Sequence, residues 1–472
     1  MTSLVVLPHA DPTLSIEAPG RRAVALHRQA VDRLTGGEAR AALLGLLREH
    51  DGPDAVGRIA LARATDEVLS GTPAATDRWI AQNVVLTLAG AAASWQVRLR
   101  LDDLDLVTGS TESSADVLAA ARAAGPFEPE LAAAAAHVTD PDAVVHLGHD
   151  QQLPALVRLG LLTGAPLAVD GAFAERHWPV VADLLPPGSS LVPTGAVEYV
   201  AGTRTTWQRR VDGVTWAGPV SGPELSGSPT RTPPGCAVGV VAVALADRDR
   251  VLLADGTALS PDAFRSAVAA LHAGGARVVV EFWLGAPGVT EEQLIGTATW
   301  LAGQDLPWRI AGARPFHLPS TTRNPPTRWA GADVAVPPTA PGLDLARSAP
   351  VVGVPPEHVL GAVTDALSAR GRLFPARLAG AYLAPADEPP AQPCLSRGVR
   401  VVAVETGHLV VDLLRLRTFA IDSRIGARLA PLAPGVPIAE VLPSTGVRDR
   451  VVAVLSSAGV LDGPSEPMGV IR

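Results

Sequence analysis

Residues 278–301 read VVVEFWLGAPGVTEEQLIGTATWL, and this stretch decides the fold class. Its first seven residues are β-branched, aromatic or otherwise mostly apolar, which predicts a buried strand. The Gly-Ala-Pro-Gly of 285–288 predicts a turn. Thr290 is a suitable helix N-cap, and the two glutamates after it favour the positive end of a helix. Ser260 is likewise a suitable N-cap for the helical pattern that begins at Pro261. The stretch therefore predicts a strand–turn–helix unit, the repeating element of α/β domains.

Two similar units lie upstream. DAVVHLG at 142–148 and APLAVDG at 165–171 read as strands, and each is followed by an amphipathic helical pattern. SSLVPTGAVEYVAG at 189–202 predicts a third strand, and LVVLPH at 4–9 predicts one before the helical, alanine-rich region up to 135. Strands that alternate with helices at this spacing favour a parallel, doubly wound sheet. Ligands of such sheets lie beyond the carboxyl ends of the strands, so a ligand site is expected at His146, Gly148, Asp170 and Gly171.

Composition limits the function classes. The chain has 472 residues, 18% of them charged, with a net charge of −8, and every basic residue is an arginine. No basic block is present for non-specific nucleic-acid binding. Without lysine there is no Schiff-base or P-loop chemistry. No long apolar run or signal peptide is seen, and the two cysteines lie far apart, so a cytoplasmic protein without membrane or nucleic-acid partners is expected.

Proline, glycine and serine divide the chain. The expected parts are an α/β domain at 1–202, a linker at 203–235, a second α/β domain at 236–382, a Pro-rich linker at 383–394 and a small α+β domain at 395–472.

The stretch at 285–292 reads G-A-P-G-V-T-E-E, and with RIAGARPFHLPST at 309–321 it resembles the later barrel strands of radical SAM enzymes. The passage at 142–200 resembles the flavodoxin-like, cobalamin-binding-type domain that precedes the barrel in one branch of that family. Branch members that modify ribosomally made peptides are most similar. The resemblance implies a cofactor site at Gly285, Pro287 and Gly288, together with the four residues of the first domain. The same strand–turn–helix pattern suits any βα unit, so the alternative that this turn has only a structural role stays open.

The chain departs from that family at its metal cluster. Radical SAM chemistry needs three cysteines spaced C-x3-C-x2-C to hold a [4Fe–4S] cluster. The corresponding region, 237–256, contains no cysteine, and Cys236 stands alone before it. We expect a degenerate, partial β/α barrel without a cluster, and cobalamin or SAM binding stays open.

The last domain has three short β-rich runs, VRVVAV, HLVVDL and RTFAID, followed by three helical stretches. RTFAIDSRIGARLAPL at 417–432 resembles the RiPP recognition element, the winged-helix-like domain of the PQQ-biosynthesis peptide chaperone family. The resemblance implies that a leader peptide adds a strand to the edge at 415–421 and packs on the last helix. The implied peptide-binding residues are Arg415, Arg417, Thr418, Phe419, Arg448, Val451 and Leu455. The arginines would suit an acidic leader, while a winged helix that packs internally or binds DNA is the alternative.

Together these features lead to the hypothesis of a non-catalytic radical SAM-like partner protein. It would bind the leader of a ribosomally made precursor and present it to an active radical SAM enzyme or other maturase. The alternative is a cluster-less enzyme that keeps a cobalamin or SAM site for group transfer. A third reading is a regulator that uses its winged-helix end.

Overall fold

The computed structural model describes the chain in the following ranges: 3–8, 22–49, 52, 54–101, 104–138, 140, 142–192, 207–211, 214–218, 220, 225, 238–306, 308–316, 328–330, 332–333, 344–345, 357–368 and 392–462. Of the expected second linker, 383–394, only the last three residues fall within these ranges.

A five-stranded sheet, sheet A, organises the first domain, and all its neighbouring strands are parallel. Its strands are β1 (Ser3–Val6), β2 (Arg22–Ala25), β5 (Val144–His146), β6 (Ala168–Asp170) and β7 (Ser190–Leu191). Their spatial order is β2-β1-β5-β6-β7. The parallel sheet expected from the alternating pattern is confirmed, and β2 is a strand that the sequence analysis did not identify.

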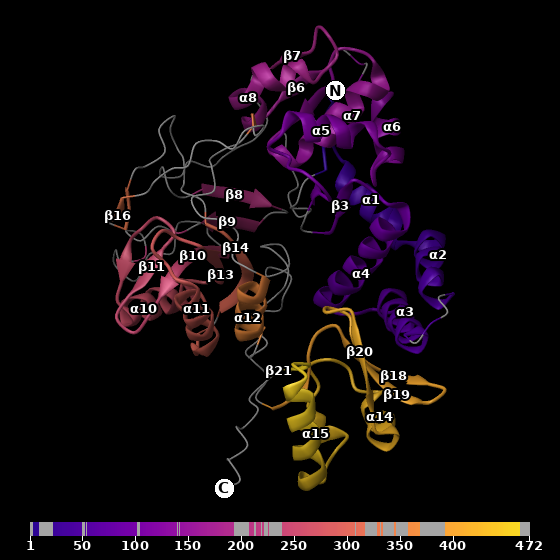
Figure 1. Ribbon diagram of the computed structural model, residues 1–472, viewed down its shortest axis with the longest axis vertical. Coiled ribbons are helices and arrows are strands. Elements are labelled where there is room, and N and C mark those ends of the chain that lie inside the picture. The colour runs from indigo at the N-terminus through magenta and orange to yellow at the C-terminus, as the bar shows by residue number, and fades with distance from the viewer. Residues whose placement is uncertain are drawn as a thin grey trace.

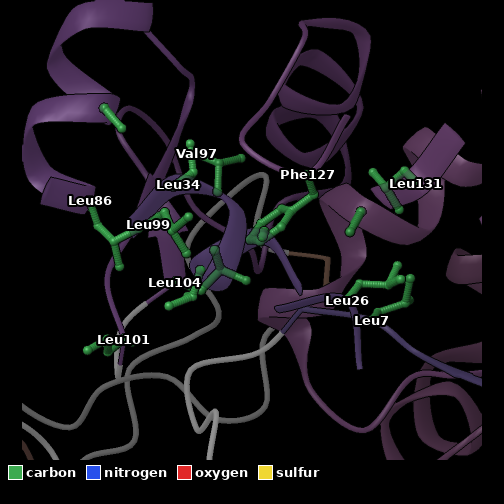
Figure 2. Close-up of a cluster of buried hydrophobic side chains, with 14 of the residues drawn as sticks. Leu7, Leu26, Leu34, Leu86, Val97, Leu99, Leu101, Leu104, Phe127 and Leu131 are labelled. Carbon is green, nitrogen blue, oxygen red and sulfur yellow. The ribbon is translucent and has the colours of Figure 1, made fainter. Parts of the chain in front are cut away.

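Helices and one hairpin complete the first domain. They are α1 (Leu26–Thr35), α2 (Gly37–Arg48), α3 (Ala55–Ser70), α4 (Ala75–Ala93), β3 (Val97–Leu99), β4 (Leu104–Leu106), α5 (Ser114–Arg122), α6 (Glu128–Ala135), the short 3-10 helix η1 (Asp150–Gln152), α7 (Leu153–Thr163) and α8 (Ala172–Asp183). Their apolar residues form one large core, in which Phe127 and Leu99 lie among leucines of α1, α4 and α6 (Figure 2).

The second domain contains sheet C, a seven-stranded mixed sheet with the main order β12-β11-β10-β13-β14. Its strands are β8 (Trp207–Val211), β9 (Val214–Gly218), β10 (Val238–Ala246), β11 (Val251–Leu253), β12 (Ala258–Leu259), β13 (Arg277–Leu284) and β14 (Trp308–Pro315). β10, β13 and β14 are parallel, as the strand–turn–helix pattern predicts. Its described strands form an open sheet, and part of the expected linker 203–235 is structured, since β8 and β9 form a hairpin that joins β10.

Helices cover one face of sheet C: α10 (Pro261–Ala273), α11 (Glu291–Gly303) and α12 (Glu357–Ser368) (Figure 1). The N-caps expected from the sequence are present, because the Ser260 hydroxyl accepts a hydrogen bond from Ala263 N and the Thr290 hydroxyl accepts one from Gln293 N. On the other face, Trp283, Phe316 and Trp329 stack edge to face. A two-stranded ladder of β15 (Arg328–Trp329) and β16 (Ala332–Asp333) lies beside them.

The last domain, coloured yellow-orange in Figure 1, has the strands-then-helices order expected from its sequence. Its elements are β17 (Cys394–Leu395), β18 (Val399–Val404), β19 (Gly407–Asp412), β20 (Arg417–Ile421), α14 (Ser423–Leu429), η2 (Ile438–Glu440), α15 (Thr445–Ser457) and β21 (Leu461–Asp462). β18, β19 and β20 form an antiparallel sheet in that order.

Both faces of this three-stranded sheet are covered. Val401, Val410 and Phe419 face α14 and α15 in the core of the last domain. Val402 and Val411 belong instead to the core of the first domain, where α3 packs across β18, β19 and β20. The last domain is therefore docked on the first-domain helices α3 and α4, as Figure 1 shows.

Candidate functional site

The carboxyl edge of sheet A brings together the four residues that the sequence analysis expected there. His146 is the last residue of β5, and Asp170 is the last residue of the neighbouring strand β6. The two residues are directly opposite each other in the parallel pairing. The Nδ1 atom of His146 lies 2.8 Å from Oδ1 of Asp170, and both side chains are buried. When Asp170 accepts from Nδ1–H, the other ring nitrogen, Nε2, keeps its lone pair and can accept a hydrogen bond.

Gln152 organises the loop after β5, although the sequence analysis did not identify it. Its Oε1 accepts hydrogen bonds from the backbone N–H groups of Gly148 (2.6 Å) and His149 (3.1 Å). Its Nε2 donates to the carbonyl oxygen of Leu7, which follows β1. Gln152 thus joins the loops that follow β1 and β5, which are neighbouring strands of sheet A. The sequence signal that could have identified Gln152 is its position four residues after Gly148, the glycine that ends the β5 pattern.

The two glycines keep these loops close to the strand ends. A Cβ atom on Gly148 would lie 3.0 Å from Nε2 of His146. Gly171 has a φ of +113°, and a Cβ there would lie 2.3 Å from the carbonyl oxygen of Leu147. A side chain at either position would push the loop away from the His146–Asp170 pair.

One carboxylate atom of the pair has no partner among the described residues. Oδ2 of Asp170 is buried and accepts no hydrogen bond. A buried acceptor without a donor is costly, typically by about 1–3 kcal/mol, so it marks a place where a ligand donor would be stabilising. A hydroxyl or amide N–H donor would satisfy this oxygen, and the amides of cobalamin and the ribose hydroxyls of SAM are donors of that kind.

A segment of the second domain reaches the first domain near this edge. Asp344 accepts hydrogen bonds from the backbone N and the hydroxyl of Ser114, at the start of α5, and Leu345 is fully buried in the first-domain core. Three residues before Ser114, the Thr111 hydroxyl donates to Asp150 of η1, in the loop after β5. The two domains are thus joined beside the carboxyl edge of sheet A.

The turn after β13 is a separate structure. Gly285 and Gly288 adopt positive φ values of +81° and +77°. Pro287 lies between them, and Val289 N donates to Ala286 O at 3.1 Å. These residues lie on sheet C, so the structure does not bring Gly285, Pro287 and Gly288 together with the His146–Asp170 pair on sheet A.

A short turn lies within 237–256, the region where the resemblance implied a cysteine loop. β10 returns as β11 through residues 247–250, where Asp247 N donates to Arg250 O at 2.9 Å. The carboxylate of Asp247 closes this turn by accepting from the backbone N–H groups of Asp249 and Arg250. Within the described ranges, no group of three His, Cys, Asp or Glu side chains could hold a metal ion.

Cys394 is buried at the start of the last domain, whereas Cys236 lies outside the described residues. Burial raises the pKa of the Cys394 thiol from its usual value of 9.0 to about 11, and the nearby Asp462 carboxylate adds to the increase. The thiol is therefore protonated at neutral pH, and a protonated thiol is a poor metal ligand and nucleophile.

The expected peptide edge is an edge of the sheet in the structure. Among the described strands, β20 pairs with β19 only. Arg417 and Ala420 are exposed, and Phe419 is half-buried. β18, at the opposite edge, is more deeply buried, with Val399, Val401 and Val402 all inaccessible to solvent or nearly so. The side chains of β20 are therefore more exposed than those of β18.

The arginines of this edge have local partners. Nη1 of Arg415 and Nε of Arg417 each lie 3.0 Å from Oδ2 of the buried Asp412. Both guanidinium groups also donate to carbonyl oxygens at the end of α15, those of Gly459 and Ala458. The two arginines therefore bind the turn between β19 and β20 to the end of α15. The Asp412 carboxylate neutralises part of their positive charge.

The other expected peptide-binding residues lie at different depths. Thr418 faces α3, because a Cβ on Gly57 would lie 2.6 Å from its hydroxyl oxygen. On α15, Arg448 is half-buried with Nε 3.6 Å from the Asp449 carboxylate, whereas Val451 and Leu455 are buried in the domain core. The side chains of Val451 and Leu455 therefore pack inside the last domain rather than on its surface.

No protein-family model, curated protein or solved structure matches the chain. Within the described part of the chain, no helix combines the length and the apolar character needed to cross a membrane.

Proposed function

We propose that this protein is a non-catalytic, radical SAM-like partner in the maturation of a ribosomally made peptide. Its last domain binds the leader of the precursor as an added strand on β20, and the protein presents the precursor to an active radical SAM enzyme or other maturase. In this proposal the first domain is flavodoxin-like and sheet C is a partial β/α barrel.

The edge of β20, which pairs with no strand other than β19 in the described part of the chain, is the observation that carries the proposal. A strand edge presents a row of backbone donors and acceptors that an extended peptide can pair with. The exposed Ala420 and half-buried Phe419 lie on that edge, and α15 beside it carries Val454 with 60% of its surface exposed. Backbone pairing and apolar contacts therefore supply the binding energy. Arg415 and Arg417 hold the start of β20 against the end of α15.

The residues behind the peptide-recognition resemblance have structural roles that support it. Asp422 caps α14 by accepting hydrogen bonds from Arg424 N and Ile425 N. Gly426 lets α14 approach β19 closely, because a Cβ there would lie 2.3 Å from Cβ of His408. This packing places α14 across the sheet and leaves the edge of β20 open among the described elements.

The strand order of sheet A supports the flavodoxin-like part of the proposal. Numbered along the chain, its five strands lie in the order 2-1-3-4-5, the order of flavodoxin-like folds. The switch point of that order falls between β1 and β5, where Gln152 joins the two following loops.

Hydrogen exchange tests the proposal on the full chain. The probes are labelled synthetic peptides that cover the N-terminal halves of the short open reading frames beside the gene. A peptide that binds by fluorescence anisotropy should slow amide exchange in 417–421, because its strand would satisfy the outward-facing N–H groups of β20. The other edge strand, β18 (Val399–Val404), is the internal control and should be unchanged.

Two results would contradict the proposal. One is that none of these peptides binds. The other is that protection appears at 144–171 or on β18 while β20 exchanges as in the free protein.

The second candidate is a group-transfer enzyme whose cobalamin or SAM lies at the carboxyl edge of sheet A. The unpartnered Oδ2 of Asp170 favours it. Titration calorimetry of the full chain with hydroxocobalamin and with SAM would test it. Binding that Asp170→Ala abolishes supports this candidate, and no binding of either compound removes it.

A further inference from the structure

We propose that α3 of the first domain forms a second wall of the peptide groove, so that an extended peptide on β20 lies between α15 and the first turn of α3. This inference rests on the proposed peptide-binding function. It adds that the first domain contributes directly to the choice of peptide.

The path of α3 across the sheet is fixed at two points. At Gly57 the helix touches the edge strand, where a Cβ would lie 2.6 Å from the Thr418 hydroxyl oxygen. Farther along the helix, Nη1 of Arg63 donates to the carbonyl oxygen of Ala403 on β18 at 3.2 Å. The helix also packs against all three strands, β20, β19 and β18. The helix therefore crosses the sheet from β20 to β18.

The first turn of α3 must then project beyond β20. A peptide strand would lie about 4.8 Å outside β20, which corresponds to about three residues of helix before Gly57. That position corresponds to Asp54, the N-cap of α3, whose side chain makes no capping hydrogen bond. Val56, in the first turn that follows, is 42% exposed.

The two walls lie on opposite faces of the sheet. Phe419 belongs to the core that includes α15, whereas its neighbour Thr418 contacts α3. Side chains of an added strand alternate in the same way, so every second residue would point toward α15 and the residues between them toward α3. On the α3 side, Val56 is the exposed apolar residue of the first turn. The occupant is therefore an extended peptide with apolar residues in both alternating sets.

The second wall is held rigidly against the sheet. Asp77 of α4 is hydrogen-bonded to Gly398 N at 2.7 Å, and α3 packs on both α4 and the sheet. A peptide that enters the groove thus meets a preformed wall, which lowers the entropic cost of binding.

The test uses the full chain and peptides selected from a random display library. Peptides of about 15 residues exceed the length of a typical strand. Selected peptides are sorted by hydrogen exchange, and those that protect 417–421 are kept. Their affinities are then measured by anisotropy for the wild type, Val56→Asp and Leu46→Asp. Leu46 is a matched control, since it is 49% exposed on α2, which packs on α1, α3 and α4.

We expect Val56→Asp to weaken binding about tenfold, through loss of one apolar contact and a desolvated charge, and Leu46→Asp to leave it unchanged. Equal affinities for the wild type and Val56→Asp, with protection of 417–421 retained, would overturn this inference and leave the proposed function standing. Failure to obtain any peptide that protects 417–421 would overturn both. Circular dichroism of each variant confirms that its fold is intact.

Discussion

The buried carboxylate of Asp77 accepts a 2.7 Å hydrogen bond from the backbone N–H of Gly398, which follows it by 321 residues. Arg397 and Arg400 flank the same carboxylate, with Nη1 atoms 3.4 and 3.6 Å from its oxygens. The close approach is shaped by Gly398 itself, because a Cβ there would lie 2.9 Å from the Ile80 side chain. One carboxylate thus joins the start of α4 to the turn before β18.

Replacing Asp77 should loosen the last domain. Asp77→Ala leaves Gly398 N–H without its acceptor and two arginines without their counter-charge, so we expect a loss of about 3 kcal/mol in the free energy of unfolding. Urea unfolding measures the loss, and limited proteolysis should cut near Gly398 more rapidly. Glu67→Ala is the control, because Glu67 pairs with Arg63 on the surface, where both side chains are more than half exposed, and should matter by about 0.5 kcal/mol. Equal stabilities for the two variants would show that the contact does not hold the domains together.

Gly171 should tolerate no side chain. Its φ of +113° is unfavourable for other residues, and a Cβ would meet the Leu147 carbonyl oxygen at 2.3 Å. Gly171→Ala should therefore lower the free energy of unfolding by more than about 2 kcal/mol. The matched control is Gly164→Ala, where φ is +58° and no atom lies within 4 Å of the added Cβ. Its expected cost is about 1 kcal/mol, and thermal unfolding compares the two.

Cys394 should react slowly with thiol reagents. In a Cys236→Ser variant it is the only thiol, and a pKa of about 11 in place of 9.0 lowers its thiolate fraction at pH 8 by about 100-fold. The rate with Ellman's reagent should be lower by that factor than in the protein unfolded by guanidinium. Reaction at the unfolded rate would mean that the thiol is accessible and not perturbed.

The same thiol makes stability fall at high pH. Because its folded pKa is raised, the unfolded thiol ionises first, so stability is unaffected below pH 9.0 and declines as the pH rises toward about 11. The Cys236→Ser, Cys394→Ala variant should lack this part of the decline, which chemical unfolding at each pH would measure.

Asp344 should hold the second domain to α5 in a pH-dependent way. Burial alone would raise the pKa of Asp344, but hydrogen bonds from the Ser114 hydroxyl and backbone N–H outweigh it, and the pKa lies below its usual 3.8. The stabilisation is therefore present above pH 3.8 and is lost as the pH falls through the lower, folded-state pKa. The difference in Tm between the wild type and Asp344→Ala should therefore shrink as the pH falls below 3.8. A difference in Tm that is independent of pH would contradict this role of Asp344.

Local signals account for the parts of the fold that the sequence predicts well. Ser260 and Thr290 cap their helices as expected, since a cap needs only residues within one turn. The β8–β9 hairpin also had a local signal: Asp212-Gly213 separates two runs rich in β-formers, a pattern typical of a two-residue hairpin turn. The surrounding proline and glycine led instead to the expectation of a linker.

Contacts between distant segments could not be predicted in this way. His146 and Asp170 could be placed at one sheet edge because parallel strands end together, but no sequence pattern links Gln152 to the carbonyl of Leu7. The docking of α3 on the last sheet is likewise invisible in the sequence, because the apolar positions of α3 show only that it is buried. To predict that β18, β19 and β20 cover α3, one would need to know which distant segments contact each other, and a single sequence does not contain that information.

The separation between Asp77 and Gly398 also has a consequence for synthesis. A ribosome needs roughly 16–64 s to add the 321 residues between them. During that interval the apolar positions of α3 and α4 that later meet Val402, Val411 and Leu413 have no covering sheet from their own chain. The nascent chain is therefore most prone to aggregation, and most in need of a chaperone, after its first helices have emerged and before its last domain has been made.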